Sequence, residues 1–224
     1  MIEEKLNKDF RIRKEELESR VNNPLSFVDG YDEVIPLKSI FKVEYVLAMP
    51  RAELESLLRN IPLRNNTNLK SYKNSEIKIF RLDPGSTKMI QTYILESKLL
   101  NFQINFGKFY HDFCFPRLSK MPAHYVAGRD NENRKVVGIY IPPIVEYING
   151  SGPVLIDGTH RGTIVHNAGT TIEVVGIFHP SLPLPCEPLP WHENIVKIKP
   201  PLEERFRKLD LDFIKDFNYV GIDG

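Results

Sequence analysis

The stretch "VLIDGTHRGTIVHNAG", from Val154 to Gly169, decides the fold because it joins an apolar strand to a short helix. Gly158 permits a tight turn after the strand, and the helix begins at Thr159 or His160. The free N–H groups of a helix N-terminus carry roughly half a positive charge. Arg161 adds a fork of donors that matches phosphate oxygens. The junction therefore predicts a site for a phosphate or a carboxylate group.

Asp157 stands immediately before this turn, and two interpretations of it stay open. In the first, its carboxylate holds a magnesium ion or a substrate hydroxyl. In the second, Asp157 only caps the helix and pairs with Arg161 on the protein surface. The short string Asp-Gly-x-His-Arg by itself favours neither interpretation.

The composition is that of an ordinary globular protein. The chain has 224 residues, of which 42% are hydrophobic and 26% charged, so it can bury a full core. Its 30 basic and 29 acidic residues leave a net charge of +1, which argues against a dedicated nucleic-acid binder. The two cysteines, Cys114 and Cys186, lack a CxxC spacing and indicate neither a disulfide scaffold nor a cysteine zinc site.

No targeting or membrane segment is expected. The first twenty residues alternate charges where a signal peptide needs an apolar core. The longest apolar run is short and is broken by Pro142 and Pro143. We therefore expect a soluble, cytoplasmic protein without a membrane partner.

The pattern of apolar residues predicts a mixed α/β fold, with strands and helices both contributing. We expect an N-terminal helical segment over residues 1–74, a main domain over 75–180 and a proline-rich extension with a C-terminal helix over 181–224. Within the first segment, helices are predicted at 3–22 and 49–61, followed by a polar loop at 62–75.

The main domain is expected to begin with a strand. The predicted elements are, in order, a strand at 76–82, a helix at 87–103, an insertion near 105–135, one or two strands at 135–150, a strand at 152–157, a short helix ending at Gly169 and a strand at 170–178. The insertion mixes aromatic residues with lysine and arginine, so it is either a packed hairpin, a lid over the helix N-terminus or a surface for single-stranded nucleic acid.

Residues 138–178 resemble the core of the ParB/sulfiredoxin superfamily. The resemblance lies in the order of a glycine, a Pro-Ile strand, a strand that ends in Asp-Gly-x-His-Arg, a helix with a late glycine and a further strand. It implies a nucleotide pocket with the phosphates at the N-terminus of the helix. By this resemblance Gly158, Thr159, His160 and Arg161 would contact the phosphates, and Asp157 would hold magnesium or the acceptor.

Differences between this chain and the branches of the superfamily reduce the number of functions that we expect for it. Sulfiredoxins carry a cysteine where this chain has Thr159, which cannot form the sulfur intermediates of that reaction. Chromosome-partitioning ParB proteins continue into a helix-turn-helix domain, whereas a proline-rich stretch follows here. The free serine kinases carry Asp-Gly-His-His-Arg, the string most similar to "DGTHR", and use an upstream glutamate as base. By position that base is Glu96, with Glu146 as a second candidate; the alternative is that Glu96 is a solvated carboxylate on a helix exterior.

The leading functional hypothesis is a nucleotide-dependent phosphotransferase or hydrolase that acts on a small hydroxyl compound. Its nucleotide would be ATP, ADP or CTP with magnesium, and its catalytic residues would be Asp157, His160 and Glu96. The competing hypothesis is a ParB-like nucleotide- or DNA-binding regulatory module, or a nuclease. No P-loop, Rossmann or nucleophile-elbow string is present, and His179, Cys186 and His192 are interpreted as surface groups rather than metal ligands.

Overall fold

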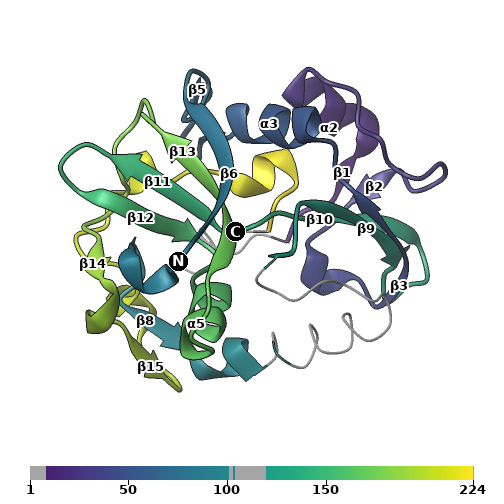
Figure 1. Cartoon of the computed structure of the whole chain (residues 1–224). Coiled ribbons are helices and arrows are strands. Elements are labelled where there is room, and N and C mark those ends of the chain that lie inside the picture. Colours follow the sequence, from purple (N-terminus) through teal and green to yellow (C-terminus); the bar gives the residue numbers. More distant parts are fainter. Residues whose placement is uncertain (1–8, 101–102, 104–119, 224) are drawn as a thin grey trace.

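The computed structural model describes residues 9–100, 103 and 120–223 (Figure 1). These residues form a mixed α/β fold, which confirms the predicted fold class. Two mixed sheets make up most of it. In Figure 1 the six-stranded sheet lies to the left and the five-stranded sheet to the right, with α2 (Lys14–Val21) and α3 (Arg51–Arg59) above them and α5 (Thr159–Asn167) below.

The five-stranded sheet combines N-terminal strands with strands from the middle of the chain. Its order is β1 (Ile12–Arg13), β2 (Glu33–Val34), β10 (Lys135–Tyr140), β9 (His124–Arg129) and β3 (Lys42–Ala48). The central hairpin β9–β10 is antiparallel, and β2 joins β10 in parallel. The N-terminal segment is therefore built into this sheet.

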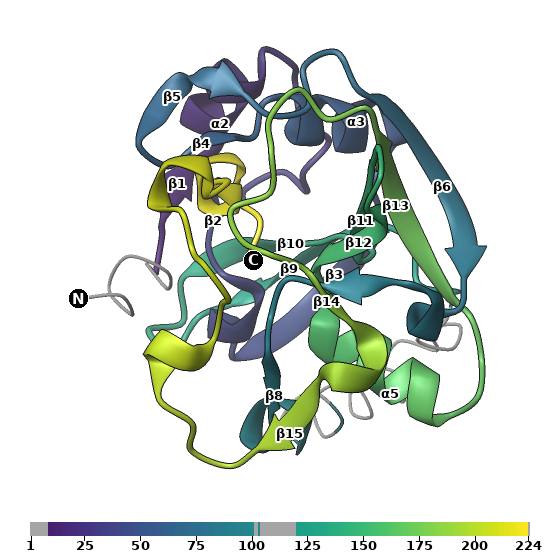
Figure 2. The same cartoon turned by 90° about the vertical axis from the view of Figure 1, so that its left-hand side faces the viewer.

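The six-stranded sheet carries the segment that opened the sequence analysis. Its order is β14 (Leu189–Pro190), β7 (Lys88–Met89), β12 (Gly152–Asp157), β11 (Ile144–Ile148), β13 (Ile172–Phe178) and β6 (Glu76–Leu82). Strand β12 leads into α5, which returns the chain to β13 (Figure 2). Two smaller sheets pair β8 (Tyr93–Leu95) with β15 (Ile195–Lys197) and β4 (Pro62–Leu63) with β5 (Asn66–Lys70).

The predicted elements of the main domain are confirmed from residue 135 onward and at β6. The helix predicted at 49–61 is α3, where Pro50 is the N-cap and the stripe of Leu54, Leu57 and Leu58 is buried. A large hydrophobic cluster includes Leu17 and Leu57 together with Val175 and Ile177. The expected boundary near residue 75 falls between β5 and β6, and this cluster contains residues from both sides of it.

Three predictions of secondary structure are wrong, two between residues 62 and 103 and one in the C-terminal segment. The loop predicted at 62–75 is largely the hairpin β4–β5. The helix predicted at 87–103 is replaced by β7 and β8, and helical residues begin only at Glu96. The reason is tertiary pairing: β7 joins β12 and β8 joins β15, and these partners override a local helical pattern.

The predicted C-terminal helix is also absent from residues 202–220. Short 3₁₀ turns occupy this region instead, namely η5 (Leu202–Glu204), η6 (Leu211–Phe213) and η7 (Phe217–Val220). Lys208 has a positive φ of 52°, and the Asp210 side chain accepts a hydrogen bond from the backbone N–H of Asp212. Both features interrupt a helix. At the other end of the chain, α2 starts at Lys14, and residues 1–8 lie outside the described part.

A buried polar network fixes the C-terminal segment to the six-stranded sheet. Glu146 on β11 is fully buried, and its Oε1 lies 2.8 Å from the Nζ of Lys215, whose side chain is 3% exposed. The Tyr72 hydroxyl donates to the same oxygen at 2.5 Å. Burial and the neighbouring Glu146 carboxylate raise the pKa of Tyr72 well above its ordinary value. A backbone hydrogen bond from the Arg64 N–H to the Ile214 carbonyl, 2.8 Å long, holds the segment in place beside this network.

Among the described residues, none of the helices combines the length and the apolar character that a membrane span requires.

Lys215→Ala should lower the free energy of unfolding by about 3–5 kcal/mol, because it leaves the buried Glu146 carboxylate without its cation. Lys208→Ala is the matched control, since the exposed Lys208 also contacts a glutamate, Glu187, at 2.8 Å. That change should cost at most about 1 kcal/mol. Chemical denaturation measures both variants. Equal losses would show that the buried pair does not constrain the fold.

Candidate functional site

The junction of β12 and α5, residues 157–161, is called the α5 mouth below. Gly158 is the helix N-cap and has a φ of +86°, in the left-handed region that favours glycine. A Cβ at this position would lie 2.6 Å from the Cβ of Pro143. The backbone must therefore pass close to the Pro-Pro segment after β10, which only glycine allows. Because the cap residue has no side chain, it cannot itself accept from the first N–H groups of the helix.

Asp157 and Arg161 form an ion pair, but they do so inside the protein. The Arg161 Nη2 lies 2.8 Å from Oδ2 of Asp157, and the two side chains are 11% and 13% exposed. The other Arg161 nitrogen donates to the backbone carbonyl of Ile141. The guanidinium also lies over the Tyr140 ring, 5.1 Å from its centroid. The expected pairing is thus present, whereas the expected surface location and the cap by Asp157 are wrong.

His160 is half-buried and stays neutral near pH 7. Burial, together with the positive charges of Lys98, Arg205 and Arg161, lowers its pKa to about 4. Its Nε2 is buried and makes no hydrogen bond within the described part of the chain. The same is true of Oγ1 of Thr159, whose side chain is 1% exposed. An unpaired buried polar atom is costly, so these two atoms, unpaired among the described residues, are candidates for hydrogen bonds to a ligand.

The electrostatics of the α5 mouth favour an anion. Three cationic side chains act on His160, and the helix N-terminus adds its own partial positive charge. Lys98 belongs to the helical residues after β8, and Arg205 follows η5. Neither is adjacent to the mouth in the sequence. The local motif could not identify these two cations, because only the packing of distant segments brings them near His160.

The two glutamates considered as bases occupy different environments. Glu96 is exposed and begins the helical residues that follow β8, and β8 packs against α5. Glu146 is buried in the network with Tyr72 and Lys215 rather than pointing out of its strand. Its ion pair gives Glu146 a structural role.

No group of three or more histidine, cysteine or acidic side chains is close enough to share a metal ion in residues 9–100, 103 and 120–223. At the α5 mouth, Oδ2 of Asp157 accepts from Arg161. The carboxylate proposed for magnesium therefore has one oxygen committed to a guanidinium.

About half of the predicted insertion, residues 105–119, lies outside the described part of the chain. The described remainder includes β9 and the start of β10. Its arginines are ion-paired: Arg129 contacts Glu44 at 2.8 Å, and Arg134 contacts Asp130 at 2.8 Å. These pairs reduce the positive charge that this part could offer to nucleic acid.

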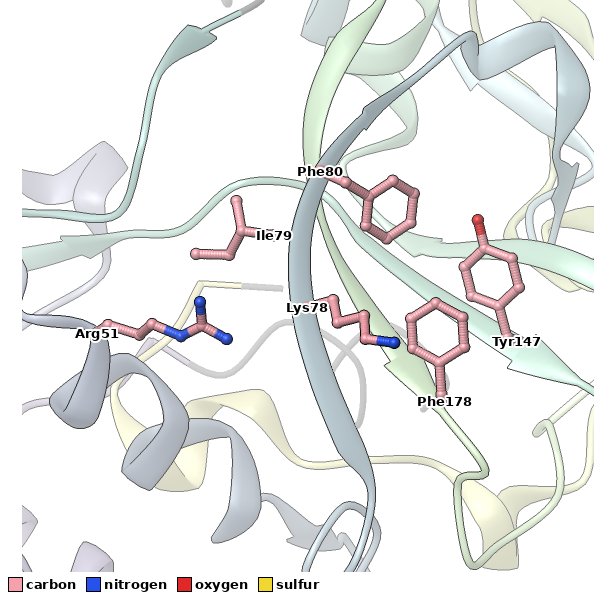
Figure 3. Close-up of a pocket in the computed structure, with 6 residues that line it drawn as sticks. All are labelled: Arg51, Lys78, Ile79, Phe80, Tyr147 and Phe178. Atoms are coloured by element: carbon pink, nitrogen blue, oxygen red, sulfur yellow. The ribbon is translucent and has the colours of Figure 1, made fainter.

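A separate hollow of about 450 Å³ lies around the edge strand β6 (Figure 3). The rings of Tyr147 and Phe178 stack there with centroids 4.3 Å apart, and Phe80 lies beside them. Its two cations are already paired, Lys78 with Glu76 at 2.9 Å and Arg51 with Glu55 at 2.8 Å. The hollow thus offers an aromatic surface rather than acid–base chemistry. Its lining residues are Arg51, Lys78, Ile79, Phe80, Tyr147 and Phe178.

A scan against protein-family models gives no match, and searches among curated proteins and solved structures also give none. The resemblance to the ParB/sulfiredoxin superfamily therefore stays a prediction from the motif in residues 138–178.

His160→Gln should make the protein less sensitive to acid. The pKa of His160 in the folded state, about 4, is below its ordinary value of 6.5, so the unfolded chain binds more protons between these values. The contribution is fully present above pH 6.5 and is lost as the pH falls towards 4. Chemical denaturation at pH 7 and pH 4.5 measures the difference. The control is His192→Gln, because His192 is exposed. An equal change in acid sensitivity in both variants would show that His160 is not the source of the effect.

Proposed function

We propose that this chain is a nucleotide-binding protein whose phosphate site is the α5 mouth. The single observation that carries the proposal is the buried Nε2 of His160, which has no hydrogen-bond partner among the described residues and lies near three positive charges at a helix N-terminus. A phosphate oxygen supplies both the negative charge and the hydrogen-bond acceptor that this arrangement lacks. Thr159 offers a hydroxyl donor within the same turn.

Arg161 contributes a fixed charge in this proposal rather than a free fork. Its two terminal nitrogens already donate to Asp157 and to the Ile141 carbonyl. The direct contacts to phosphate then come from backbone N–H groups of the first helical turn, from Thr159 and from neutral His160 acting as a donor. Lys98 and Arg205 belong to other segments of the chain, and they add positive charge near His160.

The reaction class that fits this site is phosphoryl transfer from ATP or CTP to a small hydroxyl compound, or hydrolysis of a nucleotide. Such reactions need mainly positioning and charge stabilisation, which a preorganised mouth provides. Magnesium bound to the nucleotide would neutralise phosphate charge, and Asp157 is its candidate protein ligand through the oxygen that Arg161 does not hold. His160 would stabilise charge on the transferred group.

The second candidate is a nucleotide- or DNA-binding regulatory module. The aromatic hollow at β6 favours it, because stacked rings beside Lys78 and Arg51 can bind a base face. In that case the α5 mouth would bind a ligand without consuming it. Product analysis after incubation with each nucleotide separates the two candidates, since only the enzyme converts its ligand.

ATP, ADP or CTP should stabilise the protein by about 2.7 kcal/mol when its concentration is a hundredfold above its dissociation constant. Thermal denaturation with and without magnesium measures the effect. Lys98→Ala removes a charge near His160 and should weaken binding by about 2- to 5-fold, in keeping with the energy of an exposed charge pair. Lys42→Ala, on the exposed surface of β3, is the control and should bind like the wild type.

Arg161→Ala should abolish most of the stabilisation by nucleotide, because it removes the buried charge that also positions Asp157. Arg161→Lys keeps the positive charge at this position. A loss of nucleotide stabilisation that is equal in both variants would therefore come from unfolding and not from the missing charge. Nucleotide stabilisation that persists undiminished in both Lys98→Ala and Arg161→Ala would locate the phosphate site elsewhere.

A further inference from the structure

Strand β6 forms one edge of the six-stranded sheet, and among the described strands it pairs with β13 alone. All seven of its residues take part in a regular antiparallel register, from Glu76 opposite Phe178 to Leu82 opposite Ile172. Many proteins protect such edges with bulges or very short strands, because an open edge presents unpaired N–H and C=O groups. β6 has neither form of protection, so a further strand can pair with it.

Two hydrogen bonds identify the residues of β6 whose backbone groups point away from β13. The Val175 N–H donates to the Pro143 carbonyl, on the other side of β13, so Val175 does not bond to Ile79, which lies opposite it. The Ile77 carbonyl accepts from a side chain of α3, also outside the sheet. Because bonding alternates along an antiparallel strand, Arg81 faces outward too. In the part of the chain that the structure describes, Ile79 and Arg81 have no backbone partner on this side.

The hollow of about 450 Å³ lies along this open edge. Its lining includes three consecutive residues of β6, Lys78, Ile79 and Phe80, whose side chains alternate between the two faces of the sheet. Figure 3 shows Arg51 and Ile79 on one side of the β6 ribbon and the aromatic rings on the other. A ligand that fills the hollow must therefore contact both faces across the edge. An extended peptide does so, because its successive side chains point to opposite faces.

One face of the edge is aromatic. The centroid of the Phe80 ring lies 5.9 Å from that of Tyr147 and 6.2 Å from that of Phe178, and all three side chains are partly exposed. Gly176 on β13 makes room for this arrangement, since a Cβ there would lie 2.3 Å from Cε1 of Phe80. Such a surface favours contact with an aromatic or aliphatic side chain.

The opposite face of the edge carries two arginines. Arg51 is the α3 residue that donates to the edge carbonyl, and its Nε lies 2.8 Å from Glu55. Arg81 is exposed, and its Nη2 donates to the Thr171 carbonyl at 3.4 Å. Although Glu173 lies opposite Arg81 on β13, Arg81 makes no ion pair with another described residue. Exposed ion pairs contribute little, so the charges on this face favour an acidic side chain from a partner.

We propose that the β6 edge binds an extended peptide segment of another protein, in which acidic residues alternate with aromatic or aliphatic ones. The peptide backbone pairs with the outward groups of Ile79 and Arg81. Its acidic side chains face Arg51 and Arg81, and its apolar side chains lie against Phe80 and Phe178. Strand addition of this kind obtains affinity from the main chain and specificity from alternate side chains. It does not depend on a phosphate site at the α5 mouth.

Fluorescence anisotropy with the full chain tests the proposal, with a labelled peptide that alternates glutamate with tyrosine as the probe. A peptide of the same composition with its glutamates and tyrosines in two separate blocks should bind about 10-fold more weakly or worse, because it cannot match both faces. Methylation of the backbone nitrogens of one alternate set, either all glutamates or all tyrosines, should abolish binding. Methylation of the other set should preserve it, since only one set faces β6.

Variants of the edge provide the second half of the test. Ile79→Pro removes an outward N–H, which an edge strand tolerates, and should weaken binding of the alternating peptide by about 10-fold, in keeping with one lost hydrogen bond. Arg81→Glu should weaken it by about 5-fold, the effect of an exposed charge pair. Lys73→Glu makes the same charge change in the exposed turn before β6 and should bind like the wild type. If Ile79→Pro does not fold, the methylated peptides test the same hydrogen bonds on the wild type.

Several results would overturn the proposal. Equal binding of the alternating and block peptides, or equal effects of the two methylations, would show that binding does not involve strand pairing. No binding of the alternating peptide at millimolar concentration would show that the edge does not accept it. Self-association that is lost in Ile79→Pro would show that a second copy of this chain occupies the edge. An oligothymidylate that displaces the peptide from the rings of Phe80 and Phe178 would assign them to nucleic-acid bases instead.

Discussion

The buried ion pair between Glu146 and Lys215 is the constraint on which the rest of the structure depends. A carboxylate at the centre of a sheet face is tolerated only when a cation and further hydrogen bonds accompany it. Lys215 comes from a segment without a regular helix, so this segment must cross the sheet to deliver its charge. Tyr72 completes the network from the turn after β5. One buried acid thus ties together three distant parts of the chain.

The same tail, once fixed by Lys215, continues to β10. Seven residues later Ile222 forms an isolated parallel bridge to Ile139, and the next residue of β10, Tyr140, has the Arg161 guanidinium over its ring. The mouth itself follows the same rule for buried charge, because Arg161 is enclosed and paired with Asp157 and a backbone carbonyl. Within the part of the chain that the structure describes, the Nε2 atom of His160 and the Thr159 hydroxyl have no hydrogen-bond partner there. The proposed phosphate ligand would complete these two groups.

The proposed function divides its tasks between local and distant residues. Recognition of phosphate would depend on one continuous turn, since the N–H groups, Thr159 and His160 lie in the first residues of α5. Additional positive charge would come from Lys98 and Arg205, which belong to two other segments. In this proposal the local turn binds the phosphate, and distant segments supply charge that stabilises it. This division explains why a short motif suggests a ligand more readily than a reaction.

By itself the sequence determined the strand, turn and helix around Gly158 and the apolar stripe of α3, because these depend on spacing within a few residues. It left open whether Asp157 pairs with Arg161. Only the tertiary structure decided that this pair is buried, that residues 88–95 form strands and that residues 202–220 form turns instead of a helix. Strand pairing, burial and the field of distant charges act between residues that are far apart in the chain. The lowered pKa of His160 and the paired state of Glu146 therefore follow from packing, which no local pattern contains.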